Sequence, residues 1–462
     1  ACTTPSDRAA PFSTSSPWPQ KPYFSDLFSI PTIYSGAWRK FQMVFPTNLP
    51  FNSKPSTVMH LDLNSCFATI EQQANPLLRG KPVAVAAYTT PSGCIVAPSV
   101  EAKRLGIKVG MRVKDGKLLC PSLIVLAPDP WKYRNVHLGL RKIVSDYTQE
   151  FSPKSIDEFV LNLEGYPALQ KGMCNLAREI KRRIRAEVGD WLSVSIGIAP
   201  NRFLAKTAAG LHKPDGLDEI NKDNFVKVYS GLELTDLCGI KERNAVRLNG
   251  MGIYSVPDFY KAPFWKLKAA FSSIAGYYWY LRLRGWEIDD VAFARRSYGN
   301  SYALPKPFSS IKELSPILSK LVEKMGIRLR RAGYKAKGVH LAIFFRNGSF
   351  WHKAAASAKV LFDSRDIYQE AFRLLVRCPH RSPVRELAVS CFNLSRDTSL
   401  QMELFADVAR KQKIVEALDA VNERWGNFVV TPARMAGMND TVLDRVAFGG
   451  VKELEEFTLN SR

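Results

Sequence analysis

Residues 151–160, with the sequence FSPKSIDEFV, constrain the fold most, because they place two adjacent carboxylates in an otherwise apolar run. Successive residues of a strand face opposite sides, so Asp157 and Glu158 would point apart. Burying carboxylates is costly unless something neutralises them, and Mg²⁺ prefers carboxylate and phosphate oxygens. The stretch therefore predicts a strand with a metal site. The alternative is a hairpin or strand end whose carboxylates lie in water.

A second acidic strand favours the metal site. Residues 58–71 run from an apolar strand into a helix-like segment, and Asp62 lies near the junction. If the two strands are neighbours in one sheet, Asp62 joins Asp157 and Glu158 in a cluster open to solvent at one edge. Such a cluster suits two metal ions about 3.5–4 Å apart, the arrangement that serves phosphoryl transfer.

The composition favours a nucleic-acid partner. The chain has 462 residues, of which 46% are hydrophobic, and a net charge of +22. This length predicts about three domains, and the charge indicates a polyanionic partner. No apolar run approaches the roughly 20 residues of a membrane span, so we expect no membrane association. The eight cysteines show no Cys-x-x-Cys or Cys/His metal spacing, which indicates reduced thiols in a cytoplasmic protein.

Four motifs carry a resemblance to a known family. They are LDLNSCF at 61–67, SIDE at 155–158, VSIGIAPNRFLAK at 194–206 and HKPDG at 212–216. In order and approximate spacing they resemble those of the Y-family (translesion) DNA polymerases, of the bacterial polymerase IV kind, over about residues 58–450. The resemblance implies a multidomain α/β (α+β) fold, the right-hand polymerase with palm, fingers, thumb and a C-terminal little-finger domain.

The resemblance also predicts a division of the chain. The expected domains are a palm at 58–71 and 131–230, fingers at 72–130, a thumb at 231–300 and a little finger at 308–396. Residues 301–307 are expected to be a linker. Residues 397–462 are expected to form a C-terminal extension with a helix near its start. Residues 1–57, rich in Pro, Ser and Thr without a clear period, are expected to be disordered or a mis-called extension.

Within the expected little finger, patterning predicts two helices and three strands. The helices are expected at 310–332 and 364–376, and the strands at 338–346, 349–360 and 384–394. Such alternation is typical of a compact α+β unit.

The resemblance implies template-directed nucleotidyl transfer from dNTPs to primer-template DNA. Asp62, Asp157 and Glu158 would be the catalytic residues and would hold two Mg²⁺ ions, with the backbone carbonyl of Leu63 as an extra ligand. Such ions activate a primer 3′-hydroxyl and stabilise departing pyrophosphate. No exonuclease carboxylate set is evident, so low fidelity and lesion bypass are what the resemblance implies.

Four further residues stand where the family contacts the nucleotide. Phe67 matches a steric gate that excludes a ribose 2′-hydroxyl by clash, or it is ordinary helix core. Lys213 matches a lysine that contacts phosphates, or it is a charge on a turn. The family usually has a Tyr and an Arg, three apart, on the triphosphate, but this chain has Val100 and Lys103. Lys103 offers a point charge without a bidentate fork, or it is a solvated helix charge.

Residues 237–253 resemble a helix–hairpin–helix, which presents backbone N–H groups to a DNA phosphate. Gly239, Lys241 and Arg243 are the candidate contacts, although Lys241 stands where the second hairpin glycine is usual. Arg346 is a candidate phosphate contact of the little finger. The alternatives are that the turn at 237–253 is merely structural and that Arg346 is a solvated charge.

Residues 401–405, QMELF, resemble the pentapeptide by which bacterial polymerases bind the sliding clamp. Gln401 would form hydrogen bonds, while Leu404 and Phe405 would fill an apolar pocket. The alternative is the start of a helix whose Leu and Phe pack inward.

Three rival functions remain open. A catalytically silent family member would bind DNA and the clamp as a scaffold, which Val100 and Lys103 favour weakly and the retained carboxylates oppose. A palm-type nucleotidyl cyclase would not explain the helix–hairpin–helix, the basic C-terminal domain or the clamp-like motif. A sequence-independent DNA-binding module would leave the carboxylates unexplained. We expect a monomer that acts on nucleoid DNA in the cytoplasm.

Overall fold

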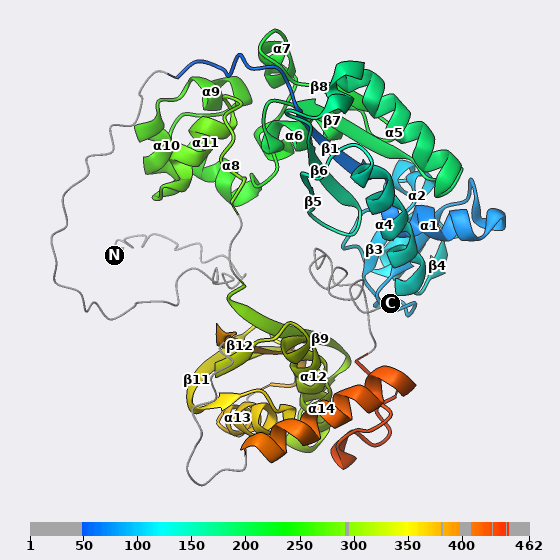
Figure 1. The fold of residues 1–462 in the computed structure, drawn as a ribbon, viewed down its shortest axis with the longest axis vertical. Coiled ribbons are helices and arrows are strands. Elements are labelled where there is room, and N and C mark those ends of the chain that lie inside the picture. Colours follow the sequence, from blue (N-terminus) through cyan, green and yellow to red (C-terminus); the bar gives the residue numbers. More distant parts are fainter. Residues whose placement is uncertain are drawn as a thin grey trace, which may run out of the picture. The chain divides into compact units, whose positions relative to one another are not determined.

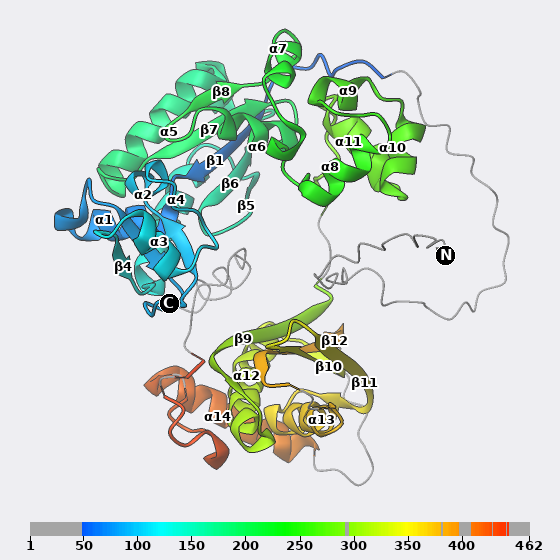
Figure 2. The same ribbon diagram turned by 180° about the vertical axis from the view of Figure 1, so that it is seen from behind.

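The computed structural model describes residues 49–291, 295–379, 382–396, 408–426, 428–439 and 441–442. The described residues up to 291 form one compact unit, and those from 295 onward form a second (Figures 1 and 2). None of the described helices is long and apolar enough to span a lipid bilayer.

A five-stranded sheet lies at the centre of the first unit, in the order β5-β6-β1-β7-β8. β1 is the middle strand, antiparallel to both β6 and β7, while β8 runs parallel to β7. The two acidic strands are therefore neighbours, which was the condition for the predicted carboxylate cluster, and Asp62 pairs with Glu158. The strands are β1 (Val58–Leu63), β5 (Phe151–Pro153), β6 (Glu158–Asn162), β7 (Val194–Ala199) and β8 (Leu217–Glu219).

Helices cover both faces of this sheet (Figure 1). α4 and α5 bury their apolar stripes with Leu61 and the other residues of β1 that share its face. α6 packs against β1 and β7 on the other face. Gly197 permits this close approach, because a Cβ there would stand 2.0 Å from the backbone oxygen of Ala205. The helices are α1 (Cys66–Ala74), α4 (Pro130–Ser145), α5 (Met173–Glu187) and α6 (Arg202–Leu211).

The acidic stretch is a hairpin rather than one continuous strand. β5 and β6 are antiparallel, and the N–H of Lys154 donates to the carbonyl of Glu158 at 2.9 Å to close the loop between them. Glu158 opens β6, whereas Asp157 ends the loop. The predicted alternation across both residues is therefore wrong. Proline at the end of β5 has no N–H for the ladder, which favours a turn here. The stretch thus forms a hairpin, which was the alternative to a single strand, and its two carboxylates still lie in one cavity with Asp62.

A small three-stranded sheet in the order β3-β2-β4 follows α1 in sequence. β2 is antiparallel to β3 and parallel to β4, and two short helices pack on it around Ile95 and Ile107. Its elements are β2 (Val83–Ala86), β3 (Ile95–Pro98), β4 (Ile124–Leu126), α2 (Val100–Arg104) and α3 (Val113–Leu119).

A helical region follows β8, and its apolar core also contains α6 residues such as Leu204. Trp279 and Tyr280 of α11 are buried in it. α7 also contributes to this core, although we assigned residues up to 230 to the palm. The helices are α7 (Phe225–Ser230), α8 (Glu242–Asn249), α9 (Val256–Lys261), α10 (Phe264–Phe271) and α11 (Ala275–Arg282).

Residues 49–57 are ordered, so the expectation of disorder up to 57 is wrong for them. Phe51 is buried in the helical core and stacks on Phe225 with ring centroids 4.2 Å apart. The N–H of Asn52 donates to the carbonyl of Arg284 at 2.8 Å, and the Arg284 guanidinium donates to the carbonyl of Leu49 at 2.9 Å. Composition averaged over the whole stretch hides this apolar anchor. Residues 1–48 lie outside the described part.

The second unit is a four-stranded antiparallel sheet in the order β11-β10-β12-β9, with α12 and α13 on one face (Figure 2). The helices and strands predicted within 308–396 are confirmed, with shifts of a few residues at their ends. Its elements are β9 (Ser297–Phe308), α12 (Ile311–Arg331), β10 (Lys335–Phe345), β11 (Phe350–Leu361), α13 (Ser364–Val376) and β12 (Val384–Ser395).

The predicted linker at 301–307 is instead part of β9, so that prediction is wrong. β9 pairs with β12 at the sheet edge, and Leu304 is buried. Two prolines suggested a linker, but an edge strand tolerates proline because one side of its backbone has no ladder partner.

The predicted helix near the start of the C-terminal extension is confirmed as α14 (Val408–Trp425). Arg330 of α12 binds the carboxylate of Asp419 through two hydrogen bonds of 2.6 and 2.7 Å, which fastens α14 to the second unit.

Candidate active site

A cavity of about 680 Å³ opens where β1, the β5–β6 loop, the start of α1, α2 and the turn after α6 meet. It brings together the catalytic, metal-binding and nucleotide-binding residues that the sequence predicts, although they come from distant parts of the chain. Those that line it are Asp62, Leu63, Phe67, Val100, Lys103, Asp157, Glu158 and Lys213.

Strand pairing positions the three carboxylates. Asp62 lies directly opposite Glu158 on antiparallel strands, so their side chains share one face. The N–H of Leu63 donates to the carbonyl of Asp157 at 2.9 Å, which holds the end of the loop against β1. The hydroxyl of Ser155 donates to the Asp157 carboxylate.

Two lysines balance this negative charge. The Nζ of Lys213 lies 2.6 Å from Oδ2 of Asp62, and the Nζ of Lys206 lies 2.8 and 2.6 Å from the two oxygens of Glu158. Lys206 was not among the site residues that the sequence predicts. Its position in the 194–206 motif could have indicated a role in the site. The sequence does not show, however, that α6 crosses the sheet above Glu158.

Burial and neighbouring charges shift the pKa values of Asp62 and Lys206. Burial raises the pKa of Asp62 above its usual value, against the opposing effect of the Lys213 ammonium. Burial alone would lower the pKa of Lys206, but its hydrogen bonds and attraction to Glu158 raise the pKa above that of an ordinary lysine. The site therefore attracts a counter-charge strongly, because desolvated carboxylates are costly without one.

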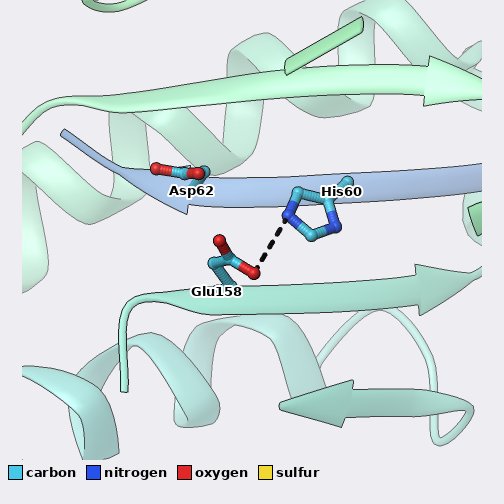
Figure 3. Close-up of side chains that lie close together, drawn as sticks. All are labelled: His60, Asp62 and Glu158. Carbon is cyan, nitrogen blue, oxygen red and sulfur yellow. Dashed lines mark ion pairs between the residues drawn. The ribbon is translucent and has the colours of Figure 1, made fainter. Parts of the chain in front are cut away.

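His60 is a member of this cluster that the sequence reading missed. It is 1% exposed, and its Nε2 lies 3.7 Å from Oε2 of Glu158 (Figure 3). Burial, reinforced by the ammonium groups of Lys206 and Lys213, lowers the pKa of His60 to about 3, so the ring is neutral. The available signal was its position two residues before Asp62, since such residues share a strand face.

The donor chemistry of the cluster fits a divalent metal ion. In the described part of the chain, His60, Asp62 and Glu158 each offer one ligand atom, all within 4.8 Å of one another. Asp157 lines the same cavity. Carboxylate oxygens are the donors that Mg²⁺ prefers, and the two lysine ammonium groups already mark the place where positive charge is stabilised.

Part of the cavity lining is formed by α2 and β3. Val100 is the first residue of α2, next to its N-cap Ser99, whose hydroxyl accepts from the N–H of Ala102 at 3.2 Å. Lys103 lies one turn later, and burial and the nearby Lys213 lower its pKa. Phe67 is 4% exposed and stacks on Tyr133 with ring centroids 4.4 Å apart, so it is a core residue that also lines the cavity.

The candidate nucleic-acid contacts lie elsewhere in the fold. Gly239, with a φ of 94°, precedes α8, and Gly239, Lys241 and Arg243 are all exposed. Arg346 is exposed at the end of β10 in the second unit. Gln401, Leu404 and Phe405 fall outside the described residues, so the clamp-binding hypothesis stays a prediction.

Comparison with known proteins gives the family. The model of the impB/mucB/samB family matches residues 61–210, and the model of that family's C-terminal domain matches residues 295–404. The chain is 31% identical to DNA polymerase IV of Pelotomaculum thermopropionicum, over 81% of this chain and 94% of the relative. It is 32% identical to DNA polymerase IV of Moorella thermoacetica, over 82% and 96% respectively.

The fold has a counterpart among solved structures. It matches that of a Y-family DNA polymerase chimera of Dbh and Dpo4 with a TM-score of 0.65 and 24% identity, covering 74% of this chain and 99% of the other. The structural match is to the same class of protein as the sequence relatives, and the family models match residues in both units. The chain therefore belongs to the impB/mucB/samB family and is a Y-family translesion DNA polymerase of the DNA polymerase IV type.

Proposed function

We propose that this polymerase extends a primer at the cavity of Asp62, Asp157 and Glu158, and that these carboxylates, with the Leu63 carbonyl, hold two Mg²⁺ ions. The observation that carries the proposal is the convergence of the three carboxylates and Lys213 in one cavity. When bound, such ions supply an activated hydroxyl and charge stabilisation at the leaving pyrophosphate. Lesion bypass is the function implied by the family.

The residues around the carboxylates handle the incoming nucleotide. Lys213 leaves Asp62 for the triphosphate, because phosphate oxygens offer it more negative charge than a carboxylate shared with a metal. Lys103 adds a second point charge from α2. Phe67 excludes a ribose 2′-hydroxyl, since its ring is fixed by stacking on Tyr133.

The remaining regions hold DNA and partners. The five-stranded sheet is the palm, the three-stranded sheet the fingers, and the helical region the thumb, whose exposed Gly239, Lys241 and Arg243 contact duplex phosphates. The second unit is the little finger, with Arg346 as one phosphate contact. Residues 401–405 bind the sliding clamp, and the polymerase acts as a cytoplasmic monomer. The scaffold alternative is not favoured, because the carboxylates meet in one cavity and the relatives are polymerases.

Primer extension tests this proposal. The full chain is assayed with Mg²⁺ on undamaged and abasic templates beside Asp157→Asn and Glu158→Gln, with DNA affinity measured in parallel. Glu164→Gln is the matched control, because Glu164 is an exposed carboxylate just beyond the same strand. Loss of extension in the two site variants alone, with DNA affinity retained, supports the proposal. Extension by either site variant at the rate of the control overturns it.

A further inference from the structure

His60 presents ring nitrogens that the protein itself does not use. Both Nδ1 and Nε2 are buried and have no hydrogen-bond partner among the described residues. Buried polar side-chain atoms nearly always have a partner, and leaving one without costs about 1–3 kcal/mol. At a merely structural position this histidine would lower the stability of the fold. An apolar side chain of similar size would pack there without leaving buried polar atoms unpaired.

The fold aims the ring at the carboxylates. His60 and Asp62 are alternate residues of β1 and share a face, and Glu158 stands opposite Asp62 on β6. Figure 3 shows the imidazole beside Glu158, on the same side of the strand as Asp62. On the other flank His60 pairs with Gly197, which has no side chain to separate the ring from α6.

The resulting donor set differs from a purely carboxylate one. One ligand atom from each of His60, Asp62 and Glu158 lies within 4.8 Å of the other two. Mg²⁺ takes oxygen ligands and demands near-ideal octahedral geometry. Imidazole nitrogen suits borderline transition metals, while carboxylates also accept Mn²⁺. A set of one nitrogen and two carboxylates therefore gives Mn²⁺ an advantage that oxygen donors alone do not.

We propose that His60 is a nitrogen ligand of a divalent-metal site formed with Asp62 and Glu158, and that this site prefers Mn²⁺ to Mg²⁺. The inference rests on the proposed role of the two carboxylates as metal ligands. The cation displaces the ammonium of Lys206 from Glu158, since both compete for the same oxygens. His60 makes the polymerase more responsive to manganese than its carboxylates alone would.

Metal binding without nucleotide or DNA tests the proposal. Mn²⁺ is titrated into the untagged full chain, its dissociation constant is measured by electron paramagnetic resonance, and that of Mg²⁺ is measured by competition. Pulsed resonance then reports whether an imidazole nitrogen couples to bound Mn²⁺. Wild type should show the nitrogen coupling. In His60→Gln the coupling should vanish and the preference for Mn²⁺ should fall at least about tenfold.

Three variants make the result decisive. His212→Gln removes an exposed histidine beside the site and should keep both the coupling and the preference. His60→Phe repeats the test with an apolar ring, in case glutamine itself binds the metal. Asp62→Asn should abolish tight Mn²⁺ binding. Tight Mn²⁺ binding that needs Asp62 but shows no nitrogen coupling overturns the role of His60 and leaves the carboxylate site standing. Absence of Mn²⁺ binding to wild type overturns both the role of His60 and the carboxylate metal site.

Discussion

The ammonium of Lys206 sits across both carboxylate oxygens of Glu158, at 2.6 and 2.8 Å, in the cluster that also contains Asp62. Lys206 stands on α6 and Glu158 on β6, so the contact fixes the helix over the sheet at the carboxylate cluster. The metal-free protein thereby stabilises a carboxylate pair that would otherwise repel. The same contact opposes metal entry, because like charges compete for one anionic site.

Lys206→Met should separate these two effects. In metal-free buffer we expect unfolding free energy to fall by about 1 kcal/mol, the scale of a partly exposed ion pair. Mg²⁺ affinity should rise about tenfold, because a competing cation is gone. Urea denaturation and calorimetric titration measure the two quantities, with the exposed Lys222→Met as control. A fall in Mg²⁺ affinity would mean that Lys206 organises Glu158 rather than competing for it.

Acid should destabilise the protein through His60. Its pKa is about 3 in the folded chain and 6.5 as the ordinary value. Between these values the unfolded chain binds a proton that the folded chain does not, so stability is full above about pH 6.5 and is lost as the pH falls. From pH 7 to pH 5 the loss assigned to His60 is about 2 kcal/mol. Urea titrations with a chelator should show it as the difference between wild type and His60→Gln. Equal losses in the two proteins would contradict the prediction.

Glycine at position 197 should be indispensable for the seating of α6. In Gly197→Ala the new Cβ would stand 2.0 Å from the Ala205 oxygen and 2.2 Å from the Ala209 nitrogen, both backbone atoms. We expect a loss of about 1–3 kcal/mol from overpacking. Gly210→Ala, at an open position of the same helix, should instead gain about 0.5–1 kcal/mol. Chemical denaturation of both variants distinguishes a steric requirement from general intolerance of substitution in this region.

Restoring the family pattern on α2 should strengthen nucleotide binding. Val100→Tyr adds a hydroxyl to the cavity wall, and Lys103→Arg adds a bidentate fork in place of a point charge. Because each gives a hydrogen bond to a charged group, we expect the double variant to lower the KM for dNTPs about tenfold. Steady-state primer extension provides the measurement. An unchanged KM would show that triphosphate contacts come from elsewhere, and Lys213 would be the next residue to vary.

Much of the site could be predicted because its residues stand at strand ends within short motifs. The neighbouring placement of Asp62 and Glu158 was a condition of the predicted metal site, and sequence spacing alone could not establish it. Asp157 was assigned to the cluster correctly but to the wrong local structure, since alternation does not reveal where a strand breaks. His60 escaped because an isolated histidine in an apolar strand has no pattern that distinguishes ligand from core.

Other features depend on contacts that sequence spacing does not encode. The role of Lys206 depends on the height at which α6 crosses the sheet, which Gly197 sets. Strand β9 was taken for a linker because Pro305 and Pro307 mark turns in most contexts, whereas an edge strand accommodates them. Residues 49–57 were grouped with a polar stretch although Phe51 anchors them.

The hydrogen bonds of residues 49–52 with α11 and with Arg284 have a mechanical consequence. The same uninterrupted backbone continues from Asn52 into β1 and on to Asp62. The segment is therefore hydrogen-bonded to the helical region at one end and continues as the middle strand of the sheet at the other. A displacement of α11 would therefore pass through the contacts of Tyr280 and Arg284 into the covalent chain that continues to the strand of Asp62.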